Sequence, residues 1–575
     1  MHLRPCFLSS WQKHFNLLIH NHVRLGSRVP QSTVTVLPRQ VRGLATSITP
    51  RDRPKDDKRE QVVILGSGWA GYVLSRKLDP AKYRVLVVSP RSYFVFTPLL
   101  NDTSVGTLEF RHVLESIRKR NSHVEYMQGW ADDVNFKDKM VTVEPSVLDP
   151  GVGHALTGPR VSPVEPNMAL VGGTGRDQVP TFPIHYDKLV IAVGCYSQTF
   201  NTKGVRENAM FLKDVRDAQA IRRRILELFE LAHLPIISEE TKRYLLHFAI
   251  VGGGPTGMEF AACLSDLIND DLVKTHPDLV KYVRITLYDV APKVLPMFDA
   301  TLADYAVKQY RRRDIDIRTS HHVEELRKGF PNDPEAVRNQ DSEVKGRVYT
   351  IRTKEDGDVG IGLCVWSTGN MNNPFVAKAL DHVRRFPTAS AHITSGEDQV
   401  QDPNARQWTI DRDPRTGVIL VDDHFRVNLS TGTIPEGQHG ESTQPRHAYV
   451  KDVFALGDTT KLKSGALPAT AQVANQQALW LGKALNRYPD PEDFARQKGF
   501  TFKNMGVFTY VGGAKAVLQG PQTDRNGVAK GLKGWIAFLV WRGAYLTMTL
   551  SWRNKFLVPM QWLAVKIWGR DLSRF

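Results

Sequence analysis

The chain has 575 residues, 41% of them hydrophobic and 24% charged, so it can bury a sizeable core and is longer than one small domain. The 43 glycines and 33 prolines exclude a collagen-like or low-complexity protein, and only four cysteines exclude a disulfide scaffold. The net charge of +16 gathers mainly at the two ends of the chain. It therefore does not indicate the basic face that nucleic-acid binding requires, and no nucleic-acid partner is expected.

The first 51 residues carry seven basic residues and no acidic one, and they mix Ser and Thr with apolar residues. This composition is typical of a mitochondrial transit peptide. We therefore predict that residues 1–59 are a transit peptide and a linker, and that the protein is mitochondrial. The alternative is a basic tail without a targeting role.

A first dinucleotide-binding unit follows. The apolar stretch Gln61–Leu65 predicts a strand, a G-x-G-x-x-G loop and a helix come next, and Tyr83–Val88 predicts a second strand. Ser89 stands where an acid would hold a ribose hydroxyl. The loop glycines let backbone N–H groups approach a pyrophosphate at the start of the helix. They are Gly66, Gly68 and Gly71.

A second unit of the same kind begins at the predicted strand His247–Val251, followed by a loop with Gly253, Gly254 and Gly257. The next strand, Val283–Tyr288, ends at Asp289. Asp289 can accept hydrogen bonds from ribose hydroxyls and repels a 2′-phosphate, which favours NAD(H) over NADP(H). We interpret the stretch 269–281 before this strand as an inserted polar turn.

Two units in series need two nucleotides, and a flavin with a nicotinamide is the pairing that we expect. The strand at 453–458 ends in Gly-Asp, and the two-dinucleotide flavoproteins place such an acid, here Asp458, on the flavin's ribityl chain. Strings at 186–194 and 365–369 resemble the returning strands of that class. The predicted fold is therefore α/β, with two Rossmann-like dinucleotide-binding domains.

Cysteine placement narrows the choice of flavoprotein. Disulfide reductases need a pair of Cys near the flavin, but Cys195 is the only Cys between Gly66 and Gly252. This argues against a disulfide reductase and weakens sulfide oxidation. No calcium-loop pattern occurs either, so no metal site is predicted.

Four strings together resemble the type II (alternative, rotenone-insensitive) NADH:ubiquinone oxidoreductases of mitochondria. They are SPRSYFVFTPLL at 89–100, GGGPTGMEFAA at 252–262, PATAQVANQ at 468–476, and a tail with WRGAYL at 541–546 and GRDLSRF at 569–575. In this family a Ser at the end of the second strand is usual, so Ser89 is no objection.

The resemblance implies roles for particular residues. It implies that Glu259 lies beside the nicotinamide of NADH and acts in catalysis; a structural alternative is a first-turn acid that complements the helix dipole. The residues implied to contact FAD are Gly66, Gly68, Gly71, Arg91, Thr97 and Asp458, and those implied to contact NADH are Gly253, Gly254, Gly257 and Asp289.

The charge-free stretch 464–482 is too polar to span a membrane, and Pro468 suits the start of a helix. Gln472 and Gln476 are four residues apart and share a helical face. Neutral amides can bond quinone carbonyls without a charge, so with the family pattern they predict the ubiquinone site. The alternative is that these amides bond to backbone.

Five of the eleven Trp lie in residues 531–575, where the charge-free runs 543–552 and 556–565 are too short to span a bilayer. Aromatic and basic residues in this mixture are typical of amphipathic helices that lie in a membrane interface. A helical hairpin on the body or a homodimer contact is the alternative.

The predicted domains are an FAD-binding part at 60–245, an NADH-binding domain at 246–380, a returning FAD and quinone segment with polar inserts at 381–530, and a membrane-anchoring domain at 531–575. The predicted function is hydride transfer from NADH to FAD and then to ubiquinone, without proton pumping, at the inner membrane. Alternatives are sulfide:quinone reductase, ferredoxin reductase and a signalling flavoprotein.

Overall fold

The computed structural model of the chain describes residues 57–120, 122–146, 181–331, 344, 346–378, 380, 383, 385–394, 407–431, 446–520, 531–549 and 551–573. The predicted transit peptide lies outside these ranges, as do large parts of the predicted polar inserts. The described chain forms two main sheets, a small antiparallel sheet beside the second of them, and a C-terminal unit of strands and helices.

The first Gly loop belongs to a twelve-stranded mixed sheet, in which ten strands follow the order β24-β21-β22-β23-β8-β1-β2-β5-β6-β7, β19 pairs with β23 and β20 pairs with β22. The bounds are β1 Glu60–Leu65, β2 Tyr83–Ser89, β5 Val124–Asn135, β6 Met140–Pro145, β7 Phe182–His185, β8 Lys188–Ile191, β19 Ala391–Ile393, β20 Trp408–Ile410, β21 Ile419–Val421, β22 Arg426–Thr431, β23 His447–Ala455 and β24 Thr460–Leu462.

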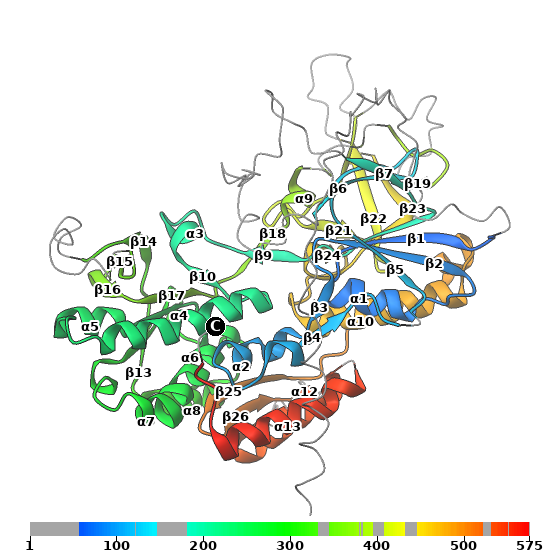
Figure 1. Ribbon diagram of the computed structural model, residues 1–575. Helices are drawn as coiled ribbons and strands as arrows, with labels where there is room; N and C mark the ends of the chain where they lie inside the picture. Colours follow the sequence, from blue (N-terminus) through cyan, green and yellow to red (C-terminus); the bar gives the residue numbers. More distant parts are fainter. Residues whose placement is uncertain are drawn as a thin grey trace, which may run out of the picture. The chain divides into compact units, whose positions relative to one another are not determined.

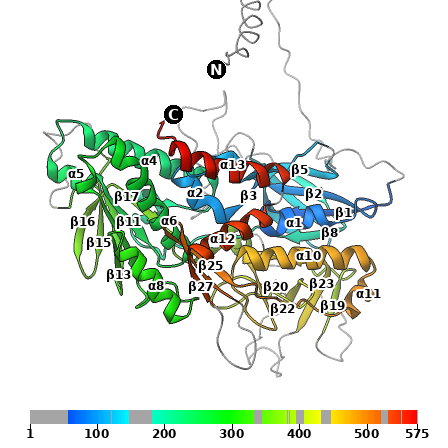
Figure 2. The ribbon, with the colours of Figure 1, turned by 90° about the horizontal axis from the view of Figure 1, so that it is seen from below.

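The middle of this sheet is parallel: β1 pairs with β2 and β8, and β8 pairs with β23. Strands β1 and β2 read as continuous apolar runs because both of their faces are buried. Helices α1 (Trp69–Lys77) and α10 (Ala471–Arg487) pack side by side, as Figure 2 shows. Two helices about 400 residues apart in the chain thus lie in one layer, blue beside orange in Figure 1.

The second Gly loop belongs to a five-stranded parallel sheet in the order β10-β17-β11-β12-β13. Its strands are β10 Met210–Phe211, β11 His247–Val251, β12 Arg284–Asp289, β13 Ile315–Thr319 and β17 Leu363–Trp366, and the neighbouring helices are α4 Val215–His233, α5 Glu239–Leu245, α6 Pro255–Leu267 and α8 Ala300–Arg311. An antiparallel sheet of β14 Val323–Lys328, β15 Tyr349–Thr353 and β16 Gly357–Ile361 joins it. The two sheets confirm the predicted fold class.

The stretch 269–281 corrects one sequence interpretation. It is helical over most of its length rather than a polar turn: a π-helix over Ile268–Leu272 continues α6, followed by α7 (Val273–Thr275) and a 3₁₀ turn over Val280–Tyr282. Asp271, which reads as polar and exposed, is buried because Arg570 from the C-terminal tail forms an ion pair with it.

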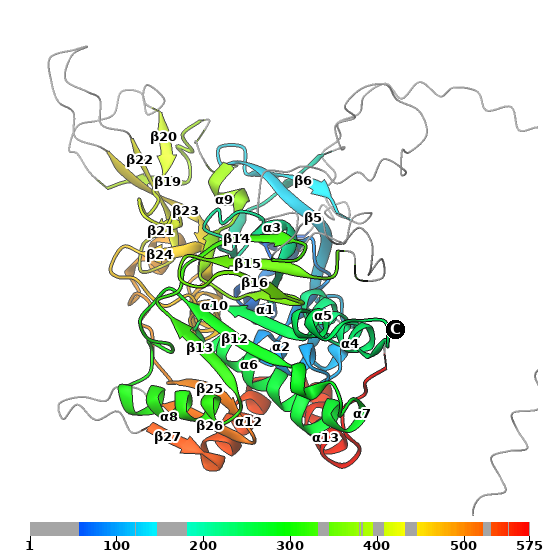
Figure 3. The same cartoon turned by 90° about the vertical axis from the view of Figure 1, so that its left-hand side faces the viewer.

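The C-terminal unit contains an antiparallel sheet of β25 (Val507–Gly512), β26 (Lys515–Gln519) and β27 (Gly531–Gly534), followed by α12 (Trp535–Met548) and α13 (Trp552–Trp568). Strand β25 contacts α6 and α8, and α12 packs on β26 (Figure 3). Within the described ranges, each helix is too short or too polar to span a membrane.

The remaining elements are short. They are β3 Tyr93–Val95 paired with β4 Leu114–Ser116, β9 Cys195–Ser197 paired with β18 Asn370–Asn372, the helices α2 Leu100–Ser104, α3 Val205–Asn208, α9 Pro374–Lys378 and α11 Pro491–Arg496, and 3₁₀ turns at Thr97–Leu99, Phe110–His112 and Gly457–Thr459.

Candidate active site

Both Gly loops open into one cavity of about 1100 Å³, which also reaches the start of α10 and the strands that return to each sheet. The predicted site residues that line it are Gly66, Gly68, Arg91, Thr97, Gly254, Glu259, Asp289 and Asp458. The predicted residues outside its lining are Gly71, Gly253, Gly257, Gln472 and Gln476. The structure thus brings predicted residues of both nucleotide units, including Asp458, Asp289 and Glu259, to a common space.

The first loop takes the sharp turn for which its glycines are suited. Gly66 has φ +108°, and a Cβ there would lie 2.3 Å from the carbonyl oxygen of Ala192. Gly71 faces back toward the strand, where a Cβ would lie 2.1 Å from the carbonyl oxygen of Gly66. Gly68 caps α1 and has open space around it. The arrangement lets a phosphate approach the helix N-terminus closely.

Arg91 and Thr97, which follow β2 in the chain, lie beside this loop. The Arg91 guanidinium forms a 2.9 Å ion pair with Asp214, the N-cap of α4, and Tyr93 donates a 3.0 Å hydrogen bond to the same carboxylate. Thr97 accepts a 3.0 Å hydrogen bond from the indole of Trp69, the first residue of α1. Arg91 and Thr97 are therefore held in place while they line the cavity.

Asp458 lies in the 3₁₀ turn after β23 and accepts a 3.2 Å hydrogen bond from the Cys195 thiol. Burial raises the pKa of Cys195 to about 12, against the opposing effect of Lys213, so the sulfur remains a thiol at neutral pH. A protonated, singly placed thiol is a poor nucleophile. Cys195, Cys263 and Cys364 are all free, so these residues offer no disulfide for sulfide chemistry.

The second loop repeats the geometry of the first. Gly252 has φ +115°, and a Cβ on Gly257 would lie 2.1 Å from the Gly252 carbonyl oxygen. Asp289 at the end of β12 accepts hydrogen bonds from the backbone N–H groups of Gly253 and Ala291. A Cβ on Gly253 would meet Asp289 at 2.9 Å, so this glycine allows the carboxylate to sit against the loop. Asp289 also lines the cavity, where it can accept from ribose hydroxyls.

Glu259, in the first half of α6, is a buried carboxyl on the cavity wall. Its Oε2 accepts a 3.0 Å hydrogen bond from the Asn101 amide, and its Oε1 accepts a 3.2 Å bond from the backbone N–H of Tyr510. Burial raises the pKa of Glu259 to about 8, more than these two donors lower it. The carboxyl is therefore mostly protonated and neutral at pH 7.

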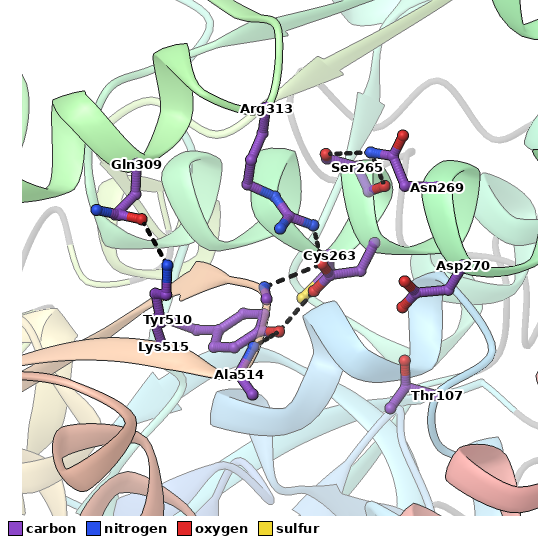
Figure 4. Close-up of polar contacts among 12 residues, drawn as sticks. Thr107, Cys263, Ser265, Asn269, Asp270, Gln309, Arg313, Tyr510, Ala514 and Lys515 are labelled. Atoms are coloured by element: carbon purple, nitrogen blue, oxygen red, sulfur yellow. Dashed lines mark hydrogen bonds and ion pairs between the residues drawn. The ribbon is translucent and has the colours of Figure 1, made fainter.

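Tyr510 ties β25 to α6 at this point. Its hydroxyl donates a 2.5 Å hydrogen bond to Asp266, which also forms an ion pair with Arg313. Figure 4 shows Arg313 and Tyr510 pointing toward the same part of α6, near Cys263. The backbone N–H that meets Glu259 and the hydroxyl that meets Asp266 belong to one residue, so β25 cannot shift without disturbing Glu259.

Gln472 and Gln476 share a face of α10, as predicted, and both bond to the backbone of 503–506. The Gln476 amide donates to Lys503 O at 2.8 Å and accepts from Lys503 N at 3.0 Å. Gln472 accepts from Met505 N at 3.3 Å. These are the contacts of the alternative interpretation, and quinone binding by the two amides stays a prediction. Helix α10 begins after its N-cap Thr470 rather than at Pro468.

Sequence reasoning missed several residues of the site. Asn101 holds Glu259, and Gln477 accepts a 2.7 Å hydrogen bond from Gly457 N and so fixes the turn that carries Asp458. Phe508 and Tyr545 line the cavity from β25 and α12. The one available signal was polarity: Asn101 and Gln477 are amides within buried surroundings.

Comparison with known proteins agrees with this geometry. The pyridine nucleotide-disulphide oxidoreductase family matches residues 60–383, and the NDH2 C-terminal domain matches residues 504–571. A protein of Dictyostelium discoideum named probable NADH dehydrogenase is 33% identical, over 97% of this chain and 99% of its own length. The mitochondrial external NADH-ubiquinone oxidoreductase 2 of Saccharomyces cerevisiae is 32% identical, over 90% of this chain and 82% of its own.

Among solved structures, NDH2 from Plasmodium falciparum in complex with NADH superposes with a TM-score of 0.66. The match covers 90% of this chain and 100% of that one, at 23% sequence identity. It supports the same arrangement of two nucleotide-binding sheets and a C-terminal unit.

Proposed function

This chain belongs to the mitochondrial type II NADH:ubiquinone oxidoreductases, within the pyridine nucleotide-disulphide oxidoreductase family, and we propose that it passes reducing equivalents from NADH through FAD to ubiquinone in the cavity described above. The observation that carries this proposal is that one space meets both Gly loops. FAD bound in this space would supply the redox chemistry, taking hydride from NADH and giving two electrons to the quinone.

We assign the first loop to FAD. Gly66 and Gly68 would admit the pyrophosphate, and Gly71 would bring α1 close to the loop. Arg91, fixed by Asp214, would supply a cation beside the dinucleotide. Thr97 and Asp458 would bond the flavin part, with Asp458 placed by the turn that Gln477 holds. Side chains at Gly66 or Gly71 would collide with backbone carbonyls, whereas Gly68 has open space around it, so the loop turns tightly and leaves room for a nucleotide.

We assign the second loop to NADH. Gly253, Gly254 and Gly257 would leave the N-terminus of α6 open to the pyrophosphate, and Asp289 would take the ribose hydroxyls. We propose domain bounds of 60–245 and 381–530 for the flavin and quinone parts and 246–380 for the NADH part, although β10, at 210–211, pairs with β17 in the second sheet.

Glu259 would act where the nicotinamide meets the flavin. As a neutral carboxyl at pH 7 it can donate or accept a hydrogen bond and adds no negative charge beside the transferred hydride. As pH rises through about 8 the carboxyl ionises, so we expect hydride transfer to change through that range.

The quinone would approach the end of the cavity that Thr470, Ala474, Phe508 and Tyr545 line. These residues are uncharged, which suits a quinone ring with an apolar tail. We propose that Gln472 and Gln476 act at this end by holding segment 503–506, which leads directly into β25 and Phe508.

We further infer that α12 and α13 attach the enzyme to a lipid surface. Their exposed side chains are mostly large and apolar, unlike the rest of the described surface. They are Trp535, Ile536, Leu539, Val540, Trp552, Phe556, Met560, Leu563, Ile567 and Trp568. Aromatic residues with nearby Lys555 and Lys566 suit a membrane interface, and a homodimer contact is the other use we expect of residues 531–575.

The purified protein, reconstituted with FAD, tests the function. We expect NADH to bleach the flavin absorption band and a soluble ubiquinone analogue to restore it. In sealed vesicles we expect turnover without acidification of either side. A band that NADH leaves unchanged would contradict the proposed function, and a proton gradient would contradict its non-pumping character.

A further inference from the structure

We propose that Asn101 and Asp102, successive residues of α2, are positioning residues that link the C-terminal helices to the ionisation of Glu259. The inference rests on the proposed function, because it concerns the carboxyl that we place beside the nicotinamide. It adds two residues to that proposal. It also says that the packing of α12 and α13 against the rest of the protein affects the protonation of Glu259 inside the cavity.

Asn101 makes the inner contact of the link. Its side chain is buried and its Nδ2 donates to Glu259 Oε2 at 3.0 Å. Its Oδ1 is also buried and accepts no hydrogen bond from the described residues. An amide carries both a donor and an acceptor, so by rotating it can serve either an ionised or a protonated carboxyl. The side chain of Asn101 is therefore suited to a partner that changes its protonation state.

Asp102 makes the outer contact. Its Oδ2 accepts a 3.2 Å hydrogen bond from the indole N–H of Trp562 on α13, and its Oδ1 accepts a 3.8 Å bond from the Cys263 thiol on α6. Arg542 of α12 stacks on the Trp562 ring, with its guanidinium carbon 4.3 Å from the ring centre. One buried carboxylate thus joins α2 to α6 and to the pair of C-terminal helices.

Two physical effects carry the influence inward. Helix α2 is a single turn, so a displacement of Asp102 moves Asn101 with it. The second effect is electrostatic: a negative charge on Asp102 disfavours a second negative charge on Glu259 in a medium of low polarity. Burial raises the pKa of Asp102, and Arg542, the Trp562 hydrogen bond and Arg570 oppose part of that rise by favouring the charged form.

One thiol and two phenols that face this pair stay protonated at neutral pH. They are Cys263 on α6, Tyr310 on α8 and Tyr545 on α12, whose pKa values burial raises well above their ordinary values. Asp266 on α6, whose pKa burial also raises, is bound by Arg313 and Tyr510. These groups are all retained in Asp102→Asn, so a change in the titration of Glu259 in that variant reports on Asp102.

The test reads the carboxyl directly. Infrared spectra of the FAD-loaded protein, recorded against pH, should contain a protonated-carboxyl carbonyl band that Glu259→Gln removes and whose midpoint is about 8. In Asp102→Asn, which keeps the size of the side chain, we expect this midpoint to fall by about half a unit to one unit. Asp452→Asn removes a buried acid elsewhere, on β23, and should leave the midpoint unchanged.

Trp562→Phe tests the connection to α13 without removing a charge. It keeps a ring under Arg542 but removes the N–H that stabilises ionised Asp102, so we expect a smaller shift in the same direction. Trp552→Phe, on the same helix but 85% exposed, is the matched control and should give no shift. Trp562→Phe and Trp552→Phe together test the connection between α13 and Glu259 even if Asp102→Asn fails to fold.

A midpoint that stays in place in Trp562→Phe, and in folded Asp102→Asn, would overturn the link. That outcome is separable from failure of the proposed function. If NADH reduces the wild-type flavin normally but the pH midpoint of the band is the same in every variant, only the proposed role of Asn101 and Asp102 is wrong. If the pH midpoint shifts as expected but NADH leaves the wild-type flavin oxidised, only the proposed function is wrong.

Discussion

At the scale of single residues, the burial of Glu259 has a cost that appears as pH dependence of stability. The folded carboxyl has a pKa of about 8 against an ordinary 4.5, so between these values the folded state holds a proton that the unfolded chain has lost. Stability from this group is complete below pH 4.5 and is lost as pH rises toward 8.

We therefore expect Glu259→Gln to gain stability relative to wild type as pH rises from 5 to 8, and the difference to level off above that, at roughly a few kcal/mol. Chemical denaturation of the flavin-loaded proteins at several pH values measures this. A difference independent of pH would show that the carboxyl is ionised in the folded state.

Asp289 should control the choice of nucleotide. In Asp289→Asn the loss of the charge weakens bonding to the ribose hydroxyls and removes the repulsion of a 2′-phosphate. A hydrogen bond to a charged group contributes about 1.5–3 kcal/mol, so the kcat/KM preference for NADH over NADPH should fall at least about tenfold. The exposed acid change Asp304→Asn should leave the preference unaltered. An unchanged ratio in Asp289→Asn would remove this residue from the assignment.

Residues were predictable where chemistry left a local pattern. Asp289 was predictable from its place at the end of a strand, and Gly66 and Gly254 were predictable from their spacing within the two loops. Asn101 was not predictable, because its partner Glu259 lies on an element far along the chain. Tyr510 was also missed, because it lies far from Glu259 in the chain. It contacts Glu259 through its backbone N–H, which any residue could supply.

At the scale of elements, the turn between β1 and α1 depends on Gly66. In Gly66→Ala the added Cβ meets the Ala192 carbonyl at 2.3 Å in a backbone conformation with φ +108°, so the turn must distort. We expect the purified variant to hold little FAD, measured by the ratio of flavin to protein absorbance. Gly465→Ala, whose Cβ has open space, should keep its flavin. Full flavin content in Gly66→Ala would contradict the assignment of this loop.

The α10 glutamines offer a second prediction at this scale. Gln472→Leu with Gln476→Leu removes the bonds to 503–506, so quinone reduction should slow while reduction of the flavin by NADH stays intact. Stopped-flow absorbance separates the two half-reactions. Asn475→Leu, on the same helix, is the control, because within the described residues its amide has no bond to 503–506. Equal slowing of both half-reactions would argue for a general structural role.

Elements with strong local signals were predicted well. Strand β11 has the predicted bounds, and β1 and β2 differ by one residue. The helical stretch 268–275 was missed because its polar Asp271 is buried by Arg570, a partner that local sequence does not reveal. The start of α10 was misplaced because the Thr470 cap, not Pro468, begins the helix.

At the scale of the whole molecule, the exposed faces of α12 and α13 predict how the enzyme associates with lipid. Trp552 and Phe556 are 85% and 73% exposed, so changing both to Ser should reduce co-sedimentation with phosphatidylcholine–cardiolipin vesicles several-fold. Ile236→Ser, an exposed apolar residue on the body, should have no effect. If the double variant still binds vesicles but loses self-association, the face is a dimer contact instead.

The arrangement in two sheets was predictable because each Gly loop, with its flanking strands, indicates one dinucleotide-binding unit. The order in which later strands return to the two sheets was harder to predict. Strand β17 returns to the second sheet, and β19 to β24 return to the first. Of these, β17 and β23 were found through strings typical of flavoproteins rather than through periodicity. The small antiparallel sheets carry no comparable signature.

The pairing of β23 with β8 has a consequence for biogenesis. All strands of the five-stranded sheet lie between β8 and β23 in the chain, so a polypeptide threaded into an organelle from its N-terminus delivers that sheet whole before β23 emerges. The inner unit is then free to fold while the outer one still lacks β23, β24 and the turn with Asp458. If Asp458 bonds the flavin as proposed, the flavin site is complete only after β23 has entered, so the cofactor would bind after the inner unit has folded.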